Sequence, residues 1–420
     1  MPETALPIHW TLKPLGALCN LTNGFAFKPS DWSSEGTPII RIQNLNGGKE
    51  FNFFKGSFVP EKYIVANGSL LFSWSGNRGT SFGPFIWKGL DGYVNQHIFK
   101  VESVGSTNVR WLYYALDRVR IMAERDAHGG SGLVHVKRSD FVKYLVECPP
   151  PCQQELIADI LDAIDDAILE ADALIEKLRT VHVGMIDDLL MRGLADDRSP
   201  RVPSALVETA VGPRPAKWKI ANLGRFVVGA EYGTNLSLGD SSAGIPVLRM
   251  NNIQDGEFDL SDLKYAPAHA VERFRVQRDD VLFNRTNSWE HVGKAAIWRQ
   301  DEPGPAFASY LVRLHCGDEL LPEFLHLWLN WAPVQRAIRQ FATPGVQQVN
   351  INPTNLRRAL IAVPDTLDEQ RAIIARVNGV STAIEDHCRE RAKLASLREG
   401  LRDDLLTGRQ QVVAIREAAE

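Results

Sequence analysis

The chain has 420 residues, a hydrophobic fraction of 44% and a formal net charge of −4, which predicts about two to four globular domains. It contains no run of about 18 apolar residues that could span a membrane, and its N-terminal "MPETALPIHW" lacks the basic-then-apolar pattern of a secretory signal. Five scattered cysteines fit reduced thiols in a cytoplasm, and no partner pair has zinc-site spacing to Cys148 or Cys152, so we expect no metal.

Residues 1–151 predict a domain of short strands and one helix. The runs "GTPIIRI", "GSLLFSW", "HIFKVE" and "KYLVECPP" carry β-branched and aromatic residues between Gly, Pro and Asn, as strands do. The run "RWLYYALDRVRIMAE" has apolar residues at helical spacing. We therefore expect an α+β domain with a twisted or partly closed sheet.

Residues 152–193 predict one long helix. After "CPPP" no Gly or Pro occurs until Gly184, and apolar positions recur every three or four residues. These positions are Ile157, Ile160, Ile164, Ile168, Ala171, Ile175, Leu178, His182, Met185 and Leu189. Such a helix is about 60 Å long. A domain of this size does not need that length for its own core, so another helix must cover the apolar stripe.

The rest of the chain repeats this plan. Residues 194–215, rich in Pro, Asp, Ser and Ala, predict a linker. Residues 216–365 predict a second α+β domain, in which "LPEFLHLWLNWAPVQRAIRQF" is the helix, and residues 366–409 predict a second long helix before a tail at 410–420. The second stripe comprises Ile373, Val377, Val380, Ile384, Leu394, Leu397, Leu401 and Leu405.

Matching motifs in the same order indicate an internal duplication. "WTLKPLG" returns as "WKIANLG", "GTPIIRIQNL" as "GIPVLRMNNI", "SLLFSW" as "DVLFNR" and "HIFKV" as "YLVRL". "VKRSDF" returns as "INPTNL", and "DDLLMRG" as "DDLLTGR". The spacing between matches drifts only within the first part of each repeat, as loop insertions on a constant scaffold would cause.

Charge favours pairing of the two long helices with each other. The middle of the first helix carries Glu170, Asp172 and Glu176, and the middle of the second carries Arg389, Arg391 and Lys393. An antiparallel pair would bring these segments together. Alternatively, both runs are solvated faces that contribute little stability.

Several of these motifs resemble those of specificity subunits of Type I restriction–modification systems. They are "HWTLKPLG" and "KWKIANLG", "PIIRIQNL" and "PVLRMNNI", "PPPCQQ" and "PDTLDEQ", and "DDLLMRG" and "DDLLTGR". The likeness covers nearly the whole chain, and its strength lies in the order of the motifs, which occurs twice. The first helix departs from the family's Pro-Pro-x-x-Glu-Gln pattern with Gln153, which we interpret as a tolerable change.

The resemblance implies an α+β fold: two repeated α/β target recognition domains joined by two long antiparallel coiled-coil helices, with pseudo-two-fold symmetry. It implies a non-catalytic subunit that binds double-stranded DNA and recognises two unlike half-sites of a bipartite, asymmetric target. It also implies assembly with two methyltransferase subunits and two motor–nuclease subunits. S-adenosylmethionine, ATP and Mg would then be bound by those partners and not by this chain.

Three polar segments in each repeat are candidates for DNA contact, because Arg and Lys pair with guanine and Asn and Gln with adenine. In the first repeat they supply Arg41, Gln43, Asn44, Trp74, Asn77, Arg78, His128, His135, Lys137 and Arg138. In the second they supply Arg249, Asn251, Asn252, Asn284, Arg285, Asn287, Gln347, Gln348, Asn350 and Asn352. Alternatively, these residues cap strand ends or form plain hairpins; Arg41 recurs as Arg249, which favours a structural role for the arginine.

Two other classes of function remain open at this point. A stand-alone methyltransferase or nuclease would need cofactor motifs, but neither a Gly-x-x-x-x-Gly-Lys-Ser/Thr loop nor an Asn-Pro-Pro-aromatic motif occurs. A protein-only scaffold would use two heads and a coiled coil to bind other proteins.

Overall fold

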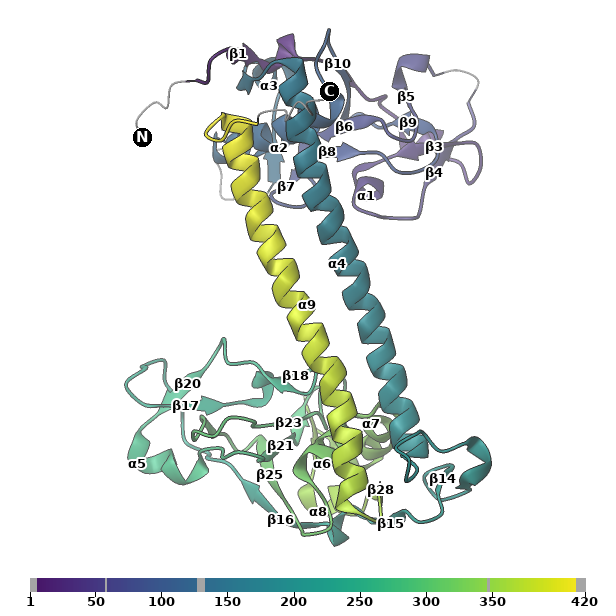
Figure 1. The fold of residues 1–420 in the computed structure, drawn as a ribbon, viewed down its shortest axis with the longest axis vertical. Helices are drawn as coiled ribbons and strands as arrows, with labels where there is room; N and C mark the ends of the chain where they lie inside the picture. Colours follow the sequence, from purple (N-terminus) through teal and green to yellow (C-terminus); the bar gives the residue numbers. More distant parts are fainter. Residues whose placement is uncertain (1–5, 57–58, 127–132, 346–347, 413–420) are drawn as a thin grey trace, which may run out of the picture. The chain divides into compact units, whose positions relative to one another are not determined.

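The computed structural model describes residues 6–56, 59–126, 133–345 and 348–412. It divides into two compact units: unit 1 comprises Met1–Asp172 and Arg389–Glu420, and unit 2 comprises Ala173–Cys388. Both units are mixed α/β, and each contains a part of the two long helices α4 (Pro151–Arg192) and α9 (Leu367–Thr407) (Figure 1). The boundary between the units therefore divides both long helices, which the sequence predicted as segments separate from the α+β domains.

Unit 1 contains two four-stranded sheets with the orders β2-β10-β6-β8 and β4-β3-β9-β5. The first comprises β2 (Cys19–Asn23), β10 (Ile98–Ser103), β6 (Leu70–Ser73) and β8 (Gly83–Ile86), and the second β4 (Asn52–Phe54), β3 (Thr37–Ile40), β9 (Gly92–Val94) and β5 (Ile64–Val65). Two strand pairs are β1 (Thr11–Pro14) with β12 (Leu145–Cys148), and β7 (Ser75–Asn77) with β11 (Leu133–His135). The predicted helix is α2 (Val109–Asp126), and α1 (Ile42–Leu45) and α3 (Arg138–Phe141) are single turns.

The core of unit 1 joins α2 to both long helices. Trp111 and Leu116 of α2 are fully buried, in one cluster with Leu161 of α4 and Leu405 of α9. The apolar face of α2 therefore packs where the expected helical spacing places it.

Unit 2 repeats this topology. Its sheets have the orders β16-β25-β21-β23 and β20-β17-β24, and β15 pairs with β28 as β1 pairs with β12. The strands are β16 (Val227–Tyr232), β25 (Leu311–Cys316), β21 (Val281–Asn284), β23 (Ala295–Ile297), β20 (Lys264–Ala266), β17 (Ile245–Leu248), β24 (Ala306–Phe307), β15 (Lys219–Asn222) and β28 (Leu360–Val363). The matching strand orders show that the duplicated motifs occupy equivalent places in the two units.

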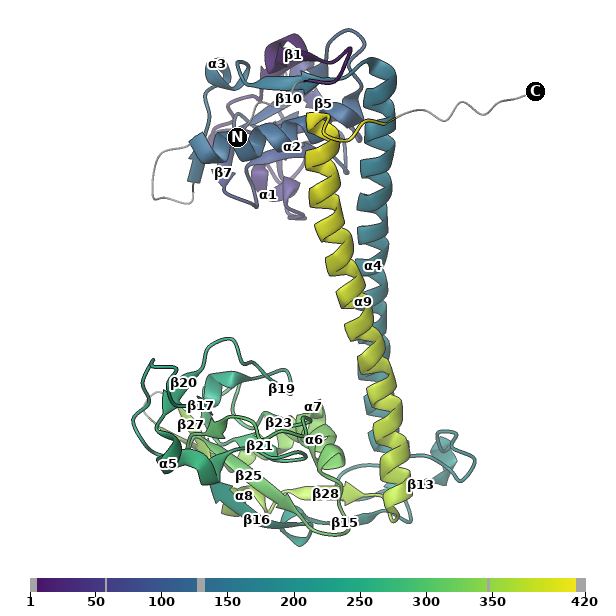
Figure 2. The same ribbon diagram turned by 60° about the vertical axis from the view of Figure 1, so that its left-hand side comes forward.

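The remaining elements of unit 2 are short. They are β13 (Leu206–Val207), β14 (Arg214–Pro215), β18 (Ile253–Gln254), β19 (Glu257–Phe258), β22 (Thr286–Asn287), β26 (Ala342–Pro344), β27 (Val349–Ile351), α5 (Ala268–Val271), α6 (Pro322–Asn330), α7 (Ala332–Ile338) and α8 (Pro353–Leu356). Figure 2 shows α6, α7 and β28 on the side of unit 2 near α9, and β17, β20 and α5 on the far side.

One expectation about unit 2 was wrong. The helix expected in residues 321–341 is broken, because α6 ends at Asn330 and Trp331 takes an extended conformation before α7 begins. Pro333 explains the break, since proline clashes with a preceding helical turn but fits the first turn of a new helix. Residues 194–215, which the sequence predicts as a linker, lie between α4 and β15 and contain local structure: Leu194 is buried, β13 pairs with β14, and Arg201 forms an ion pair with Glu369.

The two long helices begin with the same anchor. Gln154 in α4 and Gln370 in α9 are buried, and each accepts a backbone N–H and donates to a backbone carbonyl. The preceding residues, Gln153 and Glu369, accept the indole N–H groups of Trp10 and Trp218 at 2.7 and 3.2 Å. Gln153 therefore preserves the tryptophan contact of its acidic counterpart.

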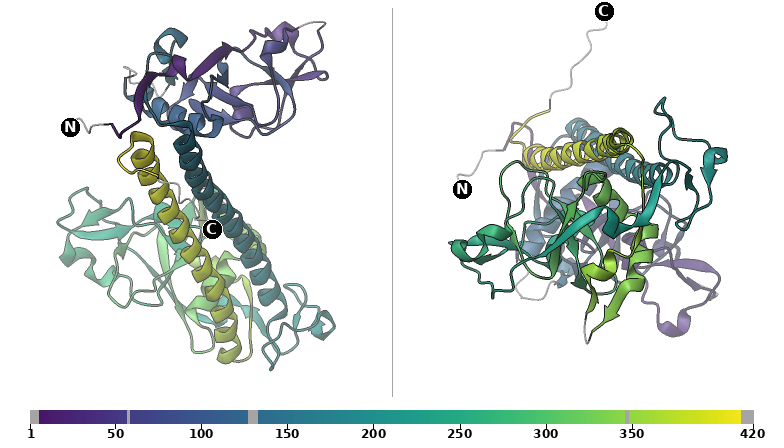
Figure 3. Two further views of the ribbon diagram at one scale, coloured as in Figure 1. Left: turned by 45° about the horizontal axis from the view of Figure 1, so that its top comes forward. Right: turned by 90° about the horizontal axis from the view of Figure 1, so that it is seen from below.

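In each unit α4 and α9 lie side by side in opposite directions (Figures 1 and 3). In unit 1 Arg398 Nε lies 2.6 Å from Asp165 Oδ1, and Arg391 Nε lies 3.0 Å from Asp172 Oδ1. In unit 2 His182 Nε2 lies 3.0 Å from Ser381 Oγ, and Glu369 accepts the N–H of Leu194. The contact of Asp172 with Arg391 is one that the charge pattern predicted, whereas Glu176 pairs within its own helix with Arg179.

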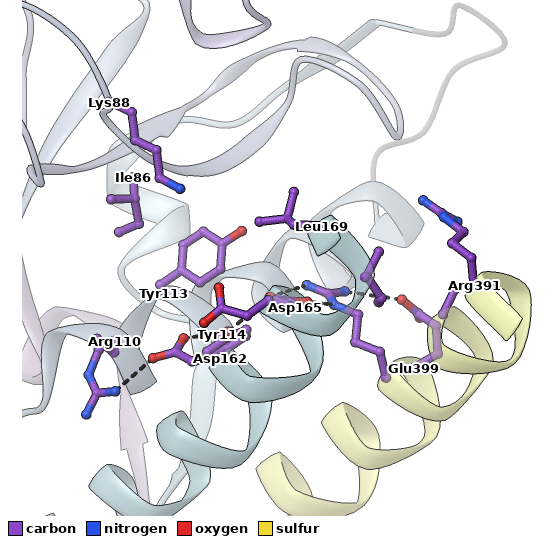
Figure 4. Close-up of a pocket in the computed structure, with 14 residues that line it drawn as sticks. Ile86, Lys88, Arg110, Tyr113, Tyr114, Asp162, Asp165, Leu169, Arg391 and Glu399 are labelled. Atoms are coloured by element: carbon purple, nitrogen blue, oxygen red, sulfur yellow. Dashed lines mark hydrogen bonds and ion pairs between the residues drawn. The ribbon is translucent and has the colours of Figure 1, made fainter. Parts of the chain in front are cut away.

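The contact between α4 and α9 in unit 1 is also linked to α2. Tyr114 donates its hydroxyl to Asp162 and lies 3.0 Å from Asp165, and Arg110 pairs with Asp162 (Figure 4). Burial and the two carboxylates raise the pKa of Tyr114 above its ordinary value. Since Asp165 also pairs with Arg398, one carboxylate connects three helices.

We predict that Arg398→Glu lowers the stability of the chain more than Lys393→Glu. The Arg398 side chain is 20% exposed and pairs with Asp165, whereas Lys393 is exposed on the same helix. The loss should be about 1.5–3 kcal/mol for Arg398→Glu, because a partly buried charged hydrogen bond becomes a repulsion. Thermal unfolding followed by circular dichroism measures it, and Asp165→Arg should restore part of the loss. Equal midpoints for the two single variants would contradict the prediction.

Candidate nucleic-acid interface

Two of the candidate segments of unit 1 meet as a strand pair. His135 of β11 lies opposite Ser75 of β7, and the ring of His135 lies 4.7 Å from the ring of Trp74. The Trp74 carbonyl also accepts the N–H of Val136. Segments about 60 residues apart in the sequence thereby become one polar surface.

The third candidate segment of unit 1 borders the same surface. Trp74 donates its indole N–H to the carbonyl of Gln96, and its ring lies 5.2 Å from that of His97. Gln96 and His97 line a cavity of about 330 Å³ together with Arg41 and Gln43. We call the set Arg41, Gln43, Trp74, Gln96, His97 and His135 loop surface 1.

In unit 2 the three candidate segments meet at Met250. The Met250 carbonyl accepts hydrogen bonds from the side-chain amides of Asn284 and Asn287, at 2.8 and 3.3 Å. Its sulfur lies 3.6 Å from Nε2 of Gln348. Asn350 donates to the Thr286 hydroxyl across the pair β22 and β27.

Arg285 extends this surface. Its guanidinium lies 5.1 Å from the ring of Tyr232 and donates to the Ser309 carbonyl, next to the half-exposed Tyr310. We call the set Asn251, Arg285, Asn287, Tyr310, Gln348 and Asn350 loop surface 2.

Three candidates belong to the fold rather than to an accessible surface. Asn44, Asn252 and Asn284 are 6%, 1% and 0% exposed. Asn44 and Asn252 each accept the backbone N–H of the preceding arginine and donate to two carbonyls of the following loop. Their amides are consumed in closing that loop, so they offer nothing to a base.

Arg41 and Arg249 occupy equivalent positions but differ in charge compensation. Arg249 pairs with Asp262 at 2.7 Å, and this guanidinium lowers the pKa of the carboxyl group. Arg41 donates to the neutral Asn52 and lies 5.0 Å from the Trp32 ring, with no ion pair among the described residues. Loop surface 1 therefore carries a positive charge at the place where loop surface 2 is neutralised.

The other candidates occupy varied places. Asn77, Arg78, Lys137 and Arg138 are exposed at the ends of β7 and β11. Asn352 caps α8 by accepting the N–H of Thr354, so its oxygen has a structural role. His128 and Gln347 lie outside the described residues.

Gln96, His97 and Tyr310 were missed by the sequence reasoning. His97 and Tyr310 begin the matched motifs "HIFKV" and "YLVRL", which were assigned only to strands. Both are exposed and lie just before β10 and β25. The signal in the sequence was that the two matched motifs begin with unlike residues, His97 and Tyr310, at equivalent positions.

The residues that the structure describes contain no cluster of three or more His, Cys, Asp or Glu side chains suited to a metal ion. Among the helices described, none is both long enough and apolar enough to cross a membrane.

Several known proteins that are similar to this chain belong to one family. The family model described as the Type I restriction modification DNA specificity domain matches residues 7–179. The specificity subunit of the Type I restriction enzyme EcoBI of Escherichia coli is 25% identical over 89% of this chain and 80% of its own length. The specificity subunit of MjaVIII of Methanocaldococcus jannaschii is 22% identical over 97% and 94%.

Solved structures show the same fold. The S subunit of a Type I system from M. genitalium has a TM-score of 0.57 at 14% identity, covering 97% of this chain and 98% of that one. A chain from work on complex assembly and conformational transition of the type I R-M system has a TM-score of 0.60 at 17% identity, covering 97% and 100%.

The repeated α/β units with paired long helices thus have the architecture of known specificity subunits. Residues 7–179 match the model of the Type I restriction modification DNA specificity domain, and most of the chain is similar to specificity subunits of Type I restriction enzymes.

We predict that Asn252→Ala destabilises unit 2, whereas Asn251→Ala leaves its stability within about 0.5 kcal/mol. Removing the Asn252 amide leaves the Arg249 N–H and two carbonyls without their buried partner, which should cost about 1–3 kcal/mol. Urea unfolding followed by tryptophan fluorescence measures both changes. A neutral Asn252→Ala would show that this amide does not close the loop.

Proposed function

We propose that this chain is the sequence-specific DNA-binding subunit of a Type I restriction–modification complex. Loop surfaces 1 and 2 would each contact one half-site of a bipartite, asymmetric target. The observation that carries the proposal is the convergence of three separate polar segments in each unit, at equivalent strand ends but with unlike side chains.

The side chains suit direct recognition of bases in the major groove. Asn and Gln can form paired hydrogen bonds with adenine, and Arg with guanine. The exposed Gln43 and Asn251 are the equivalent pair, which differ in length by one methylene. Other exposed groups, such as Lys137 and Arg138, suit phosphate contacts that position the protein without selecting a base.

We propose further that α4 and α9 form one antiparallel coiled coil, which acts as the spacer between target recognition domains at residues 1–151 and 216–365. Contacts between the helices within each unit support this pairing. Helices of 42 and 41 residues are about 60 Å long at about 1.5 Å per residue. That length spans between one and two turns of duplex, at about 34–36 Å per turn. The arrangement would have pseudo-two-fold symmetry.

The chemical steps would belong to partner subunits in the cytoplasm. We assign methylation to two methyltransferase subunits with S-adenosylmethionine, and cleavage to two motor–nuclease subunits with ATP and Mg. This chain would bind none of these cofactors. Similarity to specificity subunits of named restriction enzymes supports this division.

A mobility-shift assay separates this function from that of a protein-only scaffold. Because the net charge is −4, the isolated chain should bind random duplex weakly, and binding should strengthen when the methyltransferase subunits are added. The assay is run at two stated salt concentrations. Absence of DNA binding by the assembled complex would favour the scaffold, and methyl transfer by the chain alone would overturn the non-catalytic role.

We predict that Gln43→Ala and Asn251→Ala each relax a different half-site. Each should cost roughly 1–3 kcal/mol of discrimination at one base pair and leave the other half-site unchanged. Selection of bound duplexes from a randomised library by the methyltransferase-containing complex measures this. The exposed Gln277 lies outside both loop surfaces, so Gln277→Ala is the matched control. Loss of discrimination in both half-sites from one substitution would contradict the assignment.

A further inference from the structure

Unit 2 contains a cavity whose lining includes none of the residues of loop surface 2. It has a volume of about 480 Å³, within the range of about 300–1,000 Å³ that small-molecule sites occupy. Its walls come from the folded segment before β14, the helices α6 and α7, and the start of β28. Trp328, Trp331 and Phe341 make much of this wall aromatic.

Arg214 is a buried cation in the wall of this cavity. Its side chain is only 3% exposed, and its guanidinium lies 5.8 and 5.1 Å from the rings of Trp328 and Trp331. Among the described residues no carboxylate forms an ion pair with it, the exposed Glu208 acts on it only from beyond ion-pair distance, and its Nε has no hydrogen-bond partner. Its one side-chain hydrogen bond within the described chain joins Nη1 to the Pro213 carbonyl at 2.6 Å.

Within the described part of the chain, the buried guanidinium of Arg214 lacks a directly bonded anion. Buried charges are normally paired, because removing an ion from water costs several kcal/mol. The cation–π contacts with the two tryptophans offset only part of that cost. Burial lowers the pKa of Arg214 from its ordinary value, and the charge of Glu208 opposes this only in part.

We propose that this cavity binds a small carboxylate with an aromatic or branched apolar body. The carboxylate would pair with Arg214, and the apolar body would lie against Trp328, Trp331 and Phe341. A guanidinium binds a carboxylate through two parallel N–H donors, which supplies the missing anion. The aromatic walls offer apolar burial that an inorganic anion could not use.

The site is particular to unit 2. Arg214 comes from the segment that joins α4 to β15, and the aromatic wall depends on the break between α6 and α7. In unit 1 the corresponding helix α2 runs unbroken from Val109 to Asp126. The cavity is thus a local addition to the repeated scaffold and does not depend on the proposed contacts with DNA.

Calorimetric titration of the full chain with 4-biphenylacetate and its neutral amide tests the proposal. The acid should bind with a Kd of about 1 mM or tighter, and at least tenfold tighter than the amide. Arg214→Gln should reduce that ratio to about one. Because this variant removes a buried group, a second variant is needed: Ala337→Phe places a ring at an exposed position of the cavity wall and should weaken both ligands.

Ala332→Phe is the matched control, because Ala332 is exposed on the same helix outside this cavity. It should leave both affinities unchanged. The proposal is overturned if the acid fails to bind, if acid and amide bind equally to the unaltered chain, or if Ala337→Phe leaves the acid's affinity unchanged. None of these results depends on DNA binding, so failure here leaves the proposed function untouched.

Discussion

Pairing between α4 and α9 is the constraint on which each unit depends. The ion pair of Asp165 with Arg398 joins residues 233 positions apart, and the contact of His182 with Ser381 joins residues 199 apart. The core of unit 1 includes residues from the start of α4 and the end of α9, and the core of unit 2 includes residues from the other ends. Neither unit is therefore completed by one continuous stretch of chain.

Buried residues shared by the two units explain how one scaffold can carry unlike surfaces. The buried anchors recur almost unchanged: Gln154 and Gln370 satisfy backbone groups at the helix starts, and Asn44 and Asn252 close equivalent loops. The exposed positions beside them differ, as Gln43 differs from Asn251 and His97 from Tyr310. Stability rests on the first group, so the second can vary without cost to the core.

The sequence predicted the elements better than the surfaces. Both long helices, α2 and several strands could be predicted from the spacing of their apolar residues. A helix or strand that buries one face must repeat apolar residues at its own period. The structural role suggested by the repeated arginine fits Arg249, which pairs with Asp262, whereas Arg41 donates to the neutral Asn52. Asn252 and Asn284 were misjudged because amides suit buried loop closure as well as base recognition, and sequence alone does not distinguish exposure.

The single helix expected in residues 321–341 was wrong for a local reason. The apolar spacing of residues 321–341 continues across Pro333, and only the backbone restriction of proline breaks the helix. The composition of residues 194–215 predicted a linker, but it could not predict that Arg201 and Leu194 contact Glu369 in the first turn of α9. Its fold also places Arg214 beside two tryptophans, a contact with no local sequence signal.

We propose that two unlike surfaces on one chain recognise two separated half-sites of one duplex. Sequencing of methylated bases in host DNA, with and without this chain, checks this recognition. We expect one asymmetric motif to disappear with the chain, consisting of two different specific parts separated by a fixed number of unspecified base pairs. An uninterrupted motif, or a palindrome with two identical halves, would contradict it.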